Sequence, residues 1–316
     1  MNTNTPILSA IVIVGSCRDR AQQVVNNLCK QTIAGSIEIV IVDLGPEGAP
    51  PLATPSTMRT VSISRPKTEP WARARAHGIK QARAPIIAFI EDHCFPAPTW
   101  AAALVEAHAG PWAAIGYGFT NANPQTYISR ASMIVDYGLW AHPARRGPAR
   151  LLPGNNVSYK REALLAFGDR IETVLAPDFN IQETFEKRGL PMFIESRALA
   201  AHQNFQQLSG LLHANHAYCR LMATNRIDAQ NWGTARRLLY GLAVPLGTPA
   251  LRFLRLLRSL KGRISLLPEV IAALPIILVA FHWAAMGESL GYLFGEGNSE
   301  QDFNRWELET ERTGHA

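Results

Sequence analysis

The sequence predicts an α/β protein whose mostly parallel sheet carries helices on both faces. Apolar runs of strand length, rich in Ile and Val, occupy residues 8–14, 37–42 and 86–90. Segments of helical composition, such as residues 71–84, alternate with them, and this alternation is typical of parallel sheets. The runs lack a polar face, as expected for strands that are buried on both sides. With 316 residues, 47% of them apolar, the chain has room for one such domain and an appendage.

The first half of the chain supplies the first strands of this sheet. Residues 8–14 form the first expected strand. The helix after it is marked by apolar residues at a spacing of three and four: Ala21, Val24, Val25 and Leu28. Residues 37–42 form the second strand, with Asp43 at its carboxyl end. A loop rich in Pro and Gly at residues 45–55 precedes a shorter strand at residues 59–64.

The chain is organised around the strand at residues 86–90. This strand runs directly into Glu91, Asp92 and His93, and Pro96 then ends the extended segment before the next helix. In an open α/β sheet, ligands bind at the carboxyl ends of the strands. Two carboxylates and an imidazole at such an end suit a divalent metal ion, a phosphate-bearing ligand or both, and a solvated turn is the alternative.

The second half of the chain predicts further strands and helices. Strands are expected at residues 112–118 and 192–195, and helices at residues 129–139, 161–167 and 178–188. A histidine, His202, follows the last strand.

Motifs and composition exclude several classes of protein. The segment after the first strand contains neither G-x-G-x-x-G nor a P-loop, which disfavours a dinucleotide-binding or P-loop protein. The net charge is +6, but no nucleic-acid-binding motif is present, so no nucleic-acid partner is expected. The four cysteines lack C-x-x-C spacing, which fits a reducing compartment. No N-terminal signal peptide is recognisable, and a cytoplasmic protein is expected.

Six features in this order resemble the family 2 glycosyltransferases of the GT-A fold, over roughly residues 8–205. They are Asp43 at a strand end, an A-R-x-x-G helix with Arg75 and Gly78, Glu91-Asp92-His93 in place of a D-x-D motif, Gly154-Asn155-Asn156 before a basic helix start, a helix from Asp178 to Gly189, and the downstream His202. The resemblance implies an inverting transfer of a sugar from a nucleotide-diphosphate donor.

The resemblance also implies how the donor is bound. Asp92, His93 and His202 would hold a divalent ion, Mn²⁺ or Mg²⁺, together with the diphosphate, and Glu91 would support the sugar or the ligands. Asp43 would contact the nucleoside. A hydrogen-bonded histidine near a strand end is the alternative for His202.

The remaining roles concern the acceptor and the phosphates. Asp178 is the candidate general base, and a helix N-cap is its alternative; Glu172 and Glu183 are fallback bases. Arg75 would contact the diphosphate, unless it lies on a solvated helix face. Asn155 and Asn156 would line the acceptor side, with turn formation as the alternative.

Three positions depart from the family's pattern. His93 replaces the usual metal-binding Asp, and an imidazole suits manganese-like ions better than magnesium. Leu44 stands where many relatives have a second acid that reads the base, and Pro177 replaces the first carboxylate of a common E-D pair. The alternative to an enzyme is therefore a non-catalytic member of the fold that binds a nucleotide sugar or a partner at the membrane. A sugar nucleotidyltransferase is disfavoured, because such enzymes have a glycine-rich start after the first strand.

We expect three regions: a GT-A glycosyltransferase domain at residues 1–210, a helical membrane-associating region at residues 211–297, and an acidic polar tail at residues 298–316. Within the second region, residues 252–263 are basic and rich in leucine, which fits an interfacial helix.

Residues 264–286 are apolar over a length that could span a bilayer. A soluble helical subdomain is the alternative. We expect a peripheral or single-pass protein on the cytoplasmic side of the inner or plasma membrane. Its acceptor would then be lipid-linked or otherwise membrane-resident.

Overall fold

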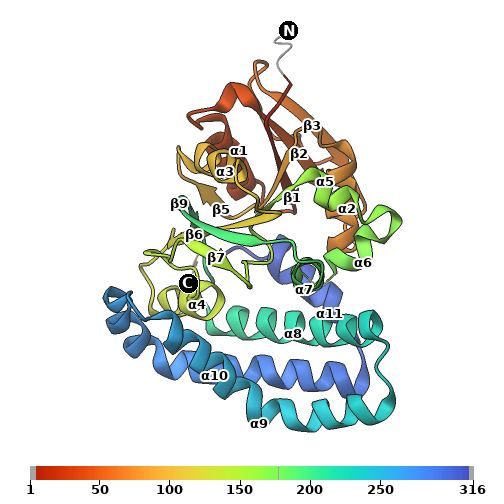
Figure 1. The fold of residues 1–316 in the computed structure, drawn as a ribbon, viewed down its shortest axis with the longest axis vertical. Coiled ribbons are helices and arrows are strands. Elements are labelled where there is room, and N and C mark those ends of the chain that lie inside the picture. Colours follow the sequence, from red (N-terminus) through yellow and green to blue (C-terminus); the bar gives the residue numbers. More distant parts are fainter. Residues whose placement is uncertain (1–4, 177, 313–316) are drawn as a thin grey trace. The chain divides into compact units, whose positions relative to one another are not determined.

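The computed structural model describes residues 5–176 and 178–312, and at residues 178–180 it describes the backbone only. Contacts divide the chain into two compact units. Unit 1 comprises Met1–Thr120 and His142–His202, and unit 2 comprises Asn121–Ala141 and Gln203–Ala316. The helices and strands are labelled in Figure 1.

Unit 1 is built on a nine-stranded sheet of order β3-β2-β1-β4-β8-β6-β9-β5, with β7 paired to β9. The strands are β1 (Leu8–Val14), β2 (Ile37–Asp43), β3 (Arg59–Ser64), β4 (Ile86–Glu91), β5 (Cys94–Pro96), β6 (Ala114–Asn121), β7 (Gly147–Ala149), β8 (Val157–Lys160) and β9 (Met192–His202). Strands β1 to β4 pair in parallel. The pairs β4–β8, β6–β8, β5–β9 and β7–β9 are antiparallel. The α/β class is confirmed, and its sheet is mixed.

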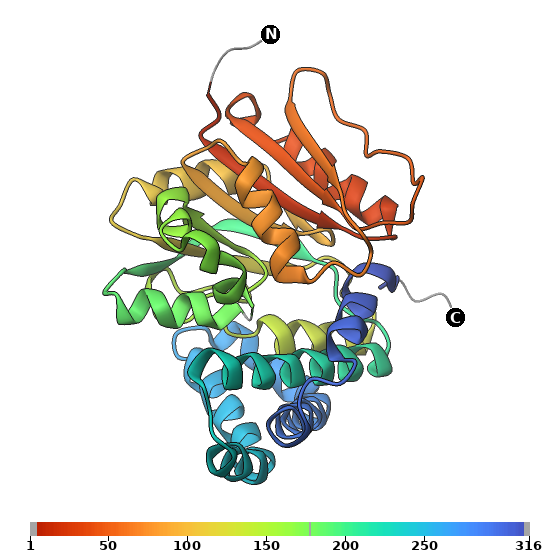
Figure 2. The same ribbon diagram turned by 90° about the vertical axis from the view of Figure 1, so that its right-hand side faces the viewer.

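Helices cover both faces of the parallel half of this sheet. The helical segments of unit 1 are α1 (Arg18–Cys29), η1 (Ala34–Ser36), α2 (Trp71–Gln81), α3 (Trp100–His108), α5 (Arg161–Leu165), η2 (Gly168–Arg170), α6 (Ile171–Leu175) and α7 (Asp178–Lys187). Helices α1 and α3 lie on one face and α2 on the other (Figures 1 and 2). Gly78 lets α2 approach β1, because a Cβ there would lie 2.6 Å from the side chain of Ile11.

Strand β9 is the largest departure from the predicted elements of unit 1. It has eleven residues and ends at His202, whereas the apolar run predicts a strand at residues 192–195 only. Its polar residues interrupt the apolar run but are paired: Arg197 donates to Glu195 at 2.9 Å and to Glu106 at 3.0 Å. The polar residues 195–197 interrupt the apolar sequence in the middle of the strand, so the periodicity does not reveal its full length.

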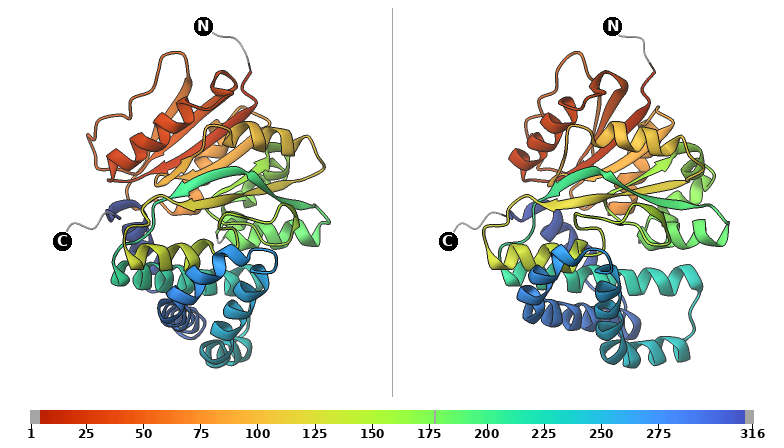
Figure 3. Two further views of the ribbon diagram at one scale, coloured as in Figure 1. Left: turned by 90° about the vertical axis from the view of Figure 1, so that its left-hand side faces the viewer. Right: turned by 60° about the vertical axis from the view of Figure 1, so that its left-hand side comes forward.

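Unit 2 is helical. It contains α4 (Tyr127–Tyr137), α8 (Leu208–Gln230), α9 (Thr234–Ser259), η3 (Ile264–Leu266), α10 (Leu267–Phe294), α11 (Ser299–Asn304) and η4 (Arg305–Glu309). Helix α10 lies between α8 and α9 (Figures 1 and 3). Its apolar residues share one buried cluster with α8 and α9 and another with α4 and α9. Among the described residues, the helix at Ile264–Phe294 is the one long and apolar enough to cross a membrane, and a third of its apolar window is buried.

Two glycines determine how closely α8 and α10 pack. A Cβ on Gly287 would collide with the carbonyl oxygen of His216, and one on Gly291 with that of Arg220. Glycines four residues apart on one helix face allow this backbone approach. The acidic segment after α10 is also packed up to residue 312. There, Trp306 stacks on His213 at 5.6 Å, and the buried Arg312 donates to Glu307 at 2.7 Å.

Candidate active site

Strand pairing brings two distant histidines together at the end of the sheet. Antiparallel pairing of β5 with β9 places Cys94 opposite His202, so that His93, one residue earlier, lies beside the end of β9. The two imidazole rings are 4.8 Å apart between centroids and inclined at 71°. Both side chains are buried.

Glu91, the last residue of β4, completes a group with these histidines. Its Oε2 lies 3.7 Å from Nε2 of His93 and 3.4 Å from Nε2 of His202. One ligand atom from each residue lies within 4.8 Å of the others, and all three residues are buried.

Two asparagines fix the carboxylate of Glu91. Asn155 donates from its amide nitrogen to Oε1 at 2.7 Å, and Asn156 donates to Oε2. The backbone N–H of Glu91 in turn donates to Oδ1 of Asn156 at 3.1 Å. Tyr117 donates to the same oxygen at 3.2 Å. Burial, with Cys94 and Glu91 nearby, raises the pKa of the Tyr117 phenol well above 10, so this hydroxyl remains a donor.

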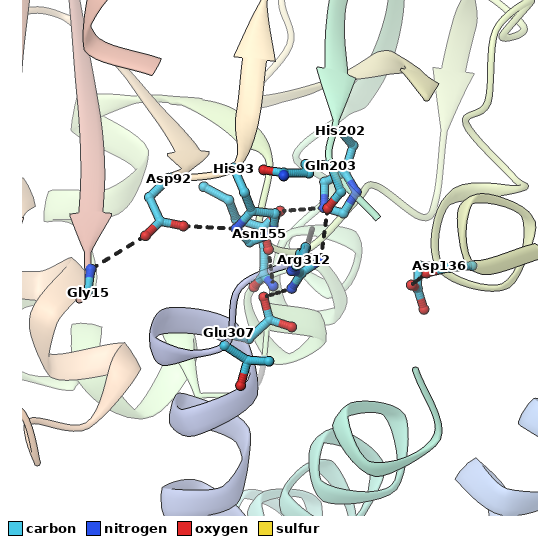
Figure 4. Close-up of polar contacts among 12 residues, drawn as sticks. Gly15, Asp92, His93, Asp136, Asn155, His202, Gln203, Glu307 and Arg312 are labelled. Carbon is cyan, nitrogen blue, oxygen red and sulfur yellow. Dashed lines mark hydrogen bonds and ion pairs between the residues drawn. The ribbon is translucent and has the colours of Figure 1, made fainter. Parts of the chain in front are cut away.

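Asp92 lies beside this group and contacts a different set of partners. Its Oδ1 is 2.8 Å from Nδ1 of His93 and 3.1 Å from Nη2 of the buried Arg20. Its Oδ2 accepts from the backbone N–H of Gly15 at 3.4 Å (Figure 4). Asp92 and His93 form the turn between β4 and β5, and this turn places His93 with Glu91 and Asp92 outside their group.

The contact with Asp92 determines which nitrogen of His93 is available. Nδ1 must carry the proton, because an ionised carboxylate only accepts hydrogen bonds. Nε2 then presents its lone pair toward Glu91 and His202. A carboxylate behind a histidine in this way orients the ring and raises its basicity as a metal ligand.

The group of Glu91, His93 and His202 fits a divalent metal ion. Two ligand atoms at about 2.1 Å from one ion in tetrahedral geometry are about 3.4 Å apart. The observed separations of 3.4 and 3.7 Å between Glu91 and the histidines match this value. A set of two imidazoles and one carboxylate suits Mn²⁺ or another transition metal better than Mg²⁺.

Asp43 and Arg75, which are expected to contact the nucleoside and the diphosphate, are both held by neighbouring side chains. Asp43 ends β2, and its two carboxylate oxygens accept from Nη1 of Arg18 at 2.8 and 2.9 Å. Arg75 is 1% exposed, so it does not lie on a solvated helix face. It donates to Asn155 at 2.9 Å, and its guanidinium lies 4.9 Å from the centre of the Phe89 ring.

Several predicted residues lie apart from this group or outside the described atoms. Asp178 begins α7, but its side chain lies outside the described residues, as does all of Pro177. Of the fallback bases, Glu172 pairs with Arg73 at 3.1 Å and Glu183 with Lys187 at 2.7 Å. Asn155 contacts Glu91 and Arg75, and Asn156 contacts Glu91 and Tyr117, so their role on the acceptor side stays a prediction.

Arg20, Tyr117 and Arg18 are site residues that the sequence analysis missed. Arg18 and Arg20 belong to the segment C-R-D-R at the start of α1, directly after the first strand. Basic residues at that position, on the same edge of the sheet as Asp43 and Asp92, are the signal that could have identified the two arginines.

The mixed α/β sheet, with carboxylates and imidazoles at its strand ends, has the architecture of the GT-A fold. Residues 9–163 match the family described as "Glycosyl transferase family 2". This match covers 155 of the 316 residues, and it supports a glycosyltransferase that uses a nucleotide-sugar donor.

One solved structure supports the fold, and a second is similar over most of the chain at a lower TM-score. The chain is similar to "Mannosyltransferase PcManGT from Pyrobaculum calidifontis in complex with GDP-Man and Mn2+", with 15% identity and a TM-score of 0.56, over 93% of this chain and 88% of that chain. It is also similar to S. aureus TarS 1-349, with 14% identity and a TM-score of 0.44, over 93% of this chain and 91% of that one. A comparison with curated proteins finds no match.

Proposed function

We propose that this protein transfers a sugar, with inversion, from a nucleotide-diphosphate donor to a lipid-linked or other membrane-resident acceptor. The observation that carries the proposal is the buried group of Glu91, His93 and His202 at the end of the sheet. Such a group has the donor set and spacing of a divalent metal site, and a metal ion neutralises the diphosphate that leaves during sugar transfer.

The residues around the group hold it ready for the donor. Asn155 and Asn156 fix the Glu91 carboxylate, and Asp92 fixes the ring of His93. These contacts remove rotational freedom from the ligands before the donor binds, so little ordering is left to occur during the reaction. We infer that Asp92 acts through His93 and that Glu91 is the carboxylate ligand.

Two residues near this group are candidates for contacts with the nucleoside and the diphosphate of the donor. Asp43, kept in place by Arg18, is our candidate for the contact with the nucleoside. Arg75 is our candidate for the diphosphate, acting from its position beside Asn155. The solved mannosyltransferase of the same fold contains GDP-Man and Mn²⁺, which supports a nucleotide donor and manganese here.

Asp178 is proposed as the general base that takes the proton of the acceptor hydroxyl. It is the first residue of α7, where Asp is also favoured as a helix cap. Asn caps a helix as well as Asp but cannot accept the proton. Asp178→Asn should therefore abolish transfer while leaving stability and Mn²⁺ binding unchanged. If Asp178→Asn transfers sugar at the wild-type rate, this aspartate is not the base.

The acceptor is proposed to lie at the cytoplasmic face of the inner or plasma membrane. The support is the apolar helix at Ile264–Phe294 and the basic, leucine-rich segment before it. A protein that reaches a lipid-linked acceptor has to sit at the bilayer surface, and these two segments are suited to that contact.

The test is a panel of nucleotide sugars incubated with the protein in Mn²⁺ or Mg²⁺, with hydrolysis of the donor as the readout. Wild type should hydrolyse one member of the panel faster in Mn²⁺ than in Mg²⁺. The His93→Ala and Asp92→Ala/His93→Ala variants should lose this activity. Full activity in either variant, or equal rates with and without metal, would contradict the assigned site.

A further inference from the structure

The outward face of α9 carries a stripe of exposed leucines. Leu246 is 86% exposed, and Leu239 and Leu242 are 65% and 69% exposed. Leu254 and Leu257 continue the stripe toward the end of the helix. The spacing of three and four residues places them on one side of the helix, opposite the side that packs on α10 through residues such as Val244.

The basic residues of this region separate into two groups. Four of the seven between positions 236 and 263 are engaged inside unit 2. Arg236 lies on Trp232, Arg237 donates to the Tyr292 carbonyl, Arg252 contacts Cys219 and Glu288, and Arg263 donates to the carbonyls of Gly138, Leu139 and Ala141. The other three, Arg255, Arg258 and Lys261, are exposed and form no ion pair with any residue that the structure describes.

We propose that the exposed leucines of α9, together with Arg255, Arg258 and Lys261, form a docking surface for an anionic phospholipid bilayer. No acid lies between positions 236 and 263, so the positive charge of the surface is complementary to anionic headgroups. Its leucines can insert at the boundary between the headgroups and the acyl chains. The inference rests on the proposed membrane-resident acceptor, because it gives the protein a way to reach that acceptor.

The packing of α10 determines how the protein meets the bilayer. This helix is held to α8 by the backbone approaches at Gly287 and Gly291. It also carries Glu288, which pairs with Arg226 of α8 at 3.1 Å. Moving α10 across the bilayer would take this ion pair and the polar residues of α8 into hydrocarbon, which is costly. We therefore infer that the protein lies on the membrane surface, with α9 in the headgroup region.

The experiment is co-sedimentation of the full chain with vesicles. Wild type should bind vesicles that contain phosphatidylglycerol and bind vesicles of phosphatidylcholine alone much less. Each basic residue near an anionic surface contributes roughly a fivefold change in affinity. The triple variant Arg255→Gln/Arg258→Gln/Lys261→Gln should therefore bind the anionic vesicles about a hundredfold more weakly.

Matched variants separate this surface from general effects. Leu242→Ser/Leu246→Ser should lower the affinity for anionic vesicles at least about tenfold, because these side chains would enter the interface. A charge-matched control, Lys30→Gln/Lys67→Gln/Lys80→Gln, removes three exposed charges from unit 1 and should bind as wild type does. Equal binding to neutral and anionic vesicles would overturn the proposal, as would a stable dimer that buries these leucines.

Two further measurements complete the test. High salt or alkaline carbonate should release the protein from cell membranes, and a requirement for detergent would show that α10 spans the bilayer and overturn the interfacial placement. Donor hydrolysis should persist in the triple variant. Loss of vesicle binding with hydrolysis intact supports the docking surface, whereas absence of hydrolysis in wild type counts against the proposed function and leaves the vesicle result to stand alone.

Discussion

Asp92→Asn is the substitution that best tests how the site is organised. Asp92 is 1% exposed in its side chain, and its Oδ1 lies 2.8 Å from Nδ1 of His93 and 3.1 Å from Nη2 of Arg20. Asparagine keeps the size but removes the charge, and its amide can present either oxygen or nitrogen to the histidine. His93 then loses the fixed partner that directs Nε2 toward Glu91.

Two effects of known size follow from this change. Loss of a carboxylate behind a metal-binding histidine typically lowers metal affinity about 10- to 100-fold. Removing the charge that faces Arg20, whose side chain is 4% exposed, should also cost about 3 kcal/mol of folding free energy. We expect Asp92→Asn to show both losses, measured by Mn²⁺ titration with electron paramagnetic resonance and by urea unfolding.

A double variant separates the two effects. In Asp92→Asn/Arg20→Met the buried cation is removed together with its partner. The free energy of unfolding should therefore return to within about 1 kcal/mol of wild type. Mn²⁺ affinity should remain low, because Met does not restore the partner of His93. As a matched control, Glu38→Gln removes a different buried carboxylate, which pairs with Arg59 at 2.8 Å. This control should lose stability and keep its Mn²⁺ affinity, and wild-type Mn²⁺ affinity in Asp92→Asn would refute the reasoning.

Three further predictions concern the metal preference, the response to pH and the helix packing. His93→Asp supplies a carboxylate in place of an imidazole and should raise the ratio of Mg²⁺ to Mn²⁺ affinity about tenfold, measured by competitive titration. Burial lowers the pKa of His108 to about 3, so below pH 6.5 the unfolded chain binds a proton that the folded chain does not. Stability should then fall by about 1.4 kcal/mol per pH unit between about pH 6 and pH 4, and His108→Gln should remove this part of the slope in urea unfolding. Gly291→Ala should destabilise unit 2 by about 1 to 3 kcal/mol in thermal unfolding, because the added Cβ would collide with the backbone of Arg220. Gly247→Ala, at an open helical position, is the control and should not destabilise unit 2 in that assay.

The parallel half of the sheet was predictable because its strands are buried on both faces. Strand β1 covers the predicted residues 8–14, and β2 extends the predicted residues 37–42 by Asp43 alone. Buried parallel strands are continuous apolar runs, so they can be recognised in a single sequence without an alignment. The antiparallel half was less predictable, because β8 has only four residues and the apolar sequence of β9 is interrupted by polar residues at 195–197.

The candidate site was predictable in its residue types but less so in its arrangement. Glu91 and His93 stand at a strand end, so their nearness follows from the chain. The approach of His202 depends on the register of β5 with β9, which no local pattern specifies. The pairing of Arg20 with Asp92 likewise joins segments 72 residues apart. The assignment of residues 1–210 to one domain stays a prediction, and contacts group Asn121–Ala141 with the C-terminal helices.

The replacement of a D-x-D motif by Glu91-Asp92-His93 is coherent with the rest of the site. A histidine at position 93 needs a partner for its second nitrogen, and Asp92 supplies it at 2.8 Å. A longer carboxylate at position 91 needs support, and Asn155 and Asn156 supply it. With one carboxylate and two neutral imidazoles, the donor set cancels less of a divalent charge than two carboxylates would, so more of that charge remains for a diphosphate. We therefore expect His93, in place of the usual Asp, to favour binding of a leaving diphosphate, and the hydrolysis panel in Mn²⁺ tests this expectation.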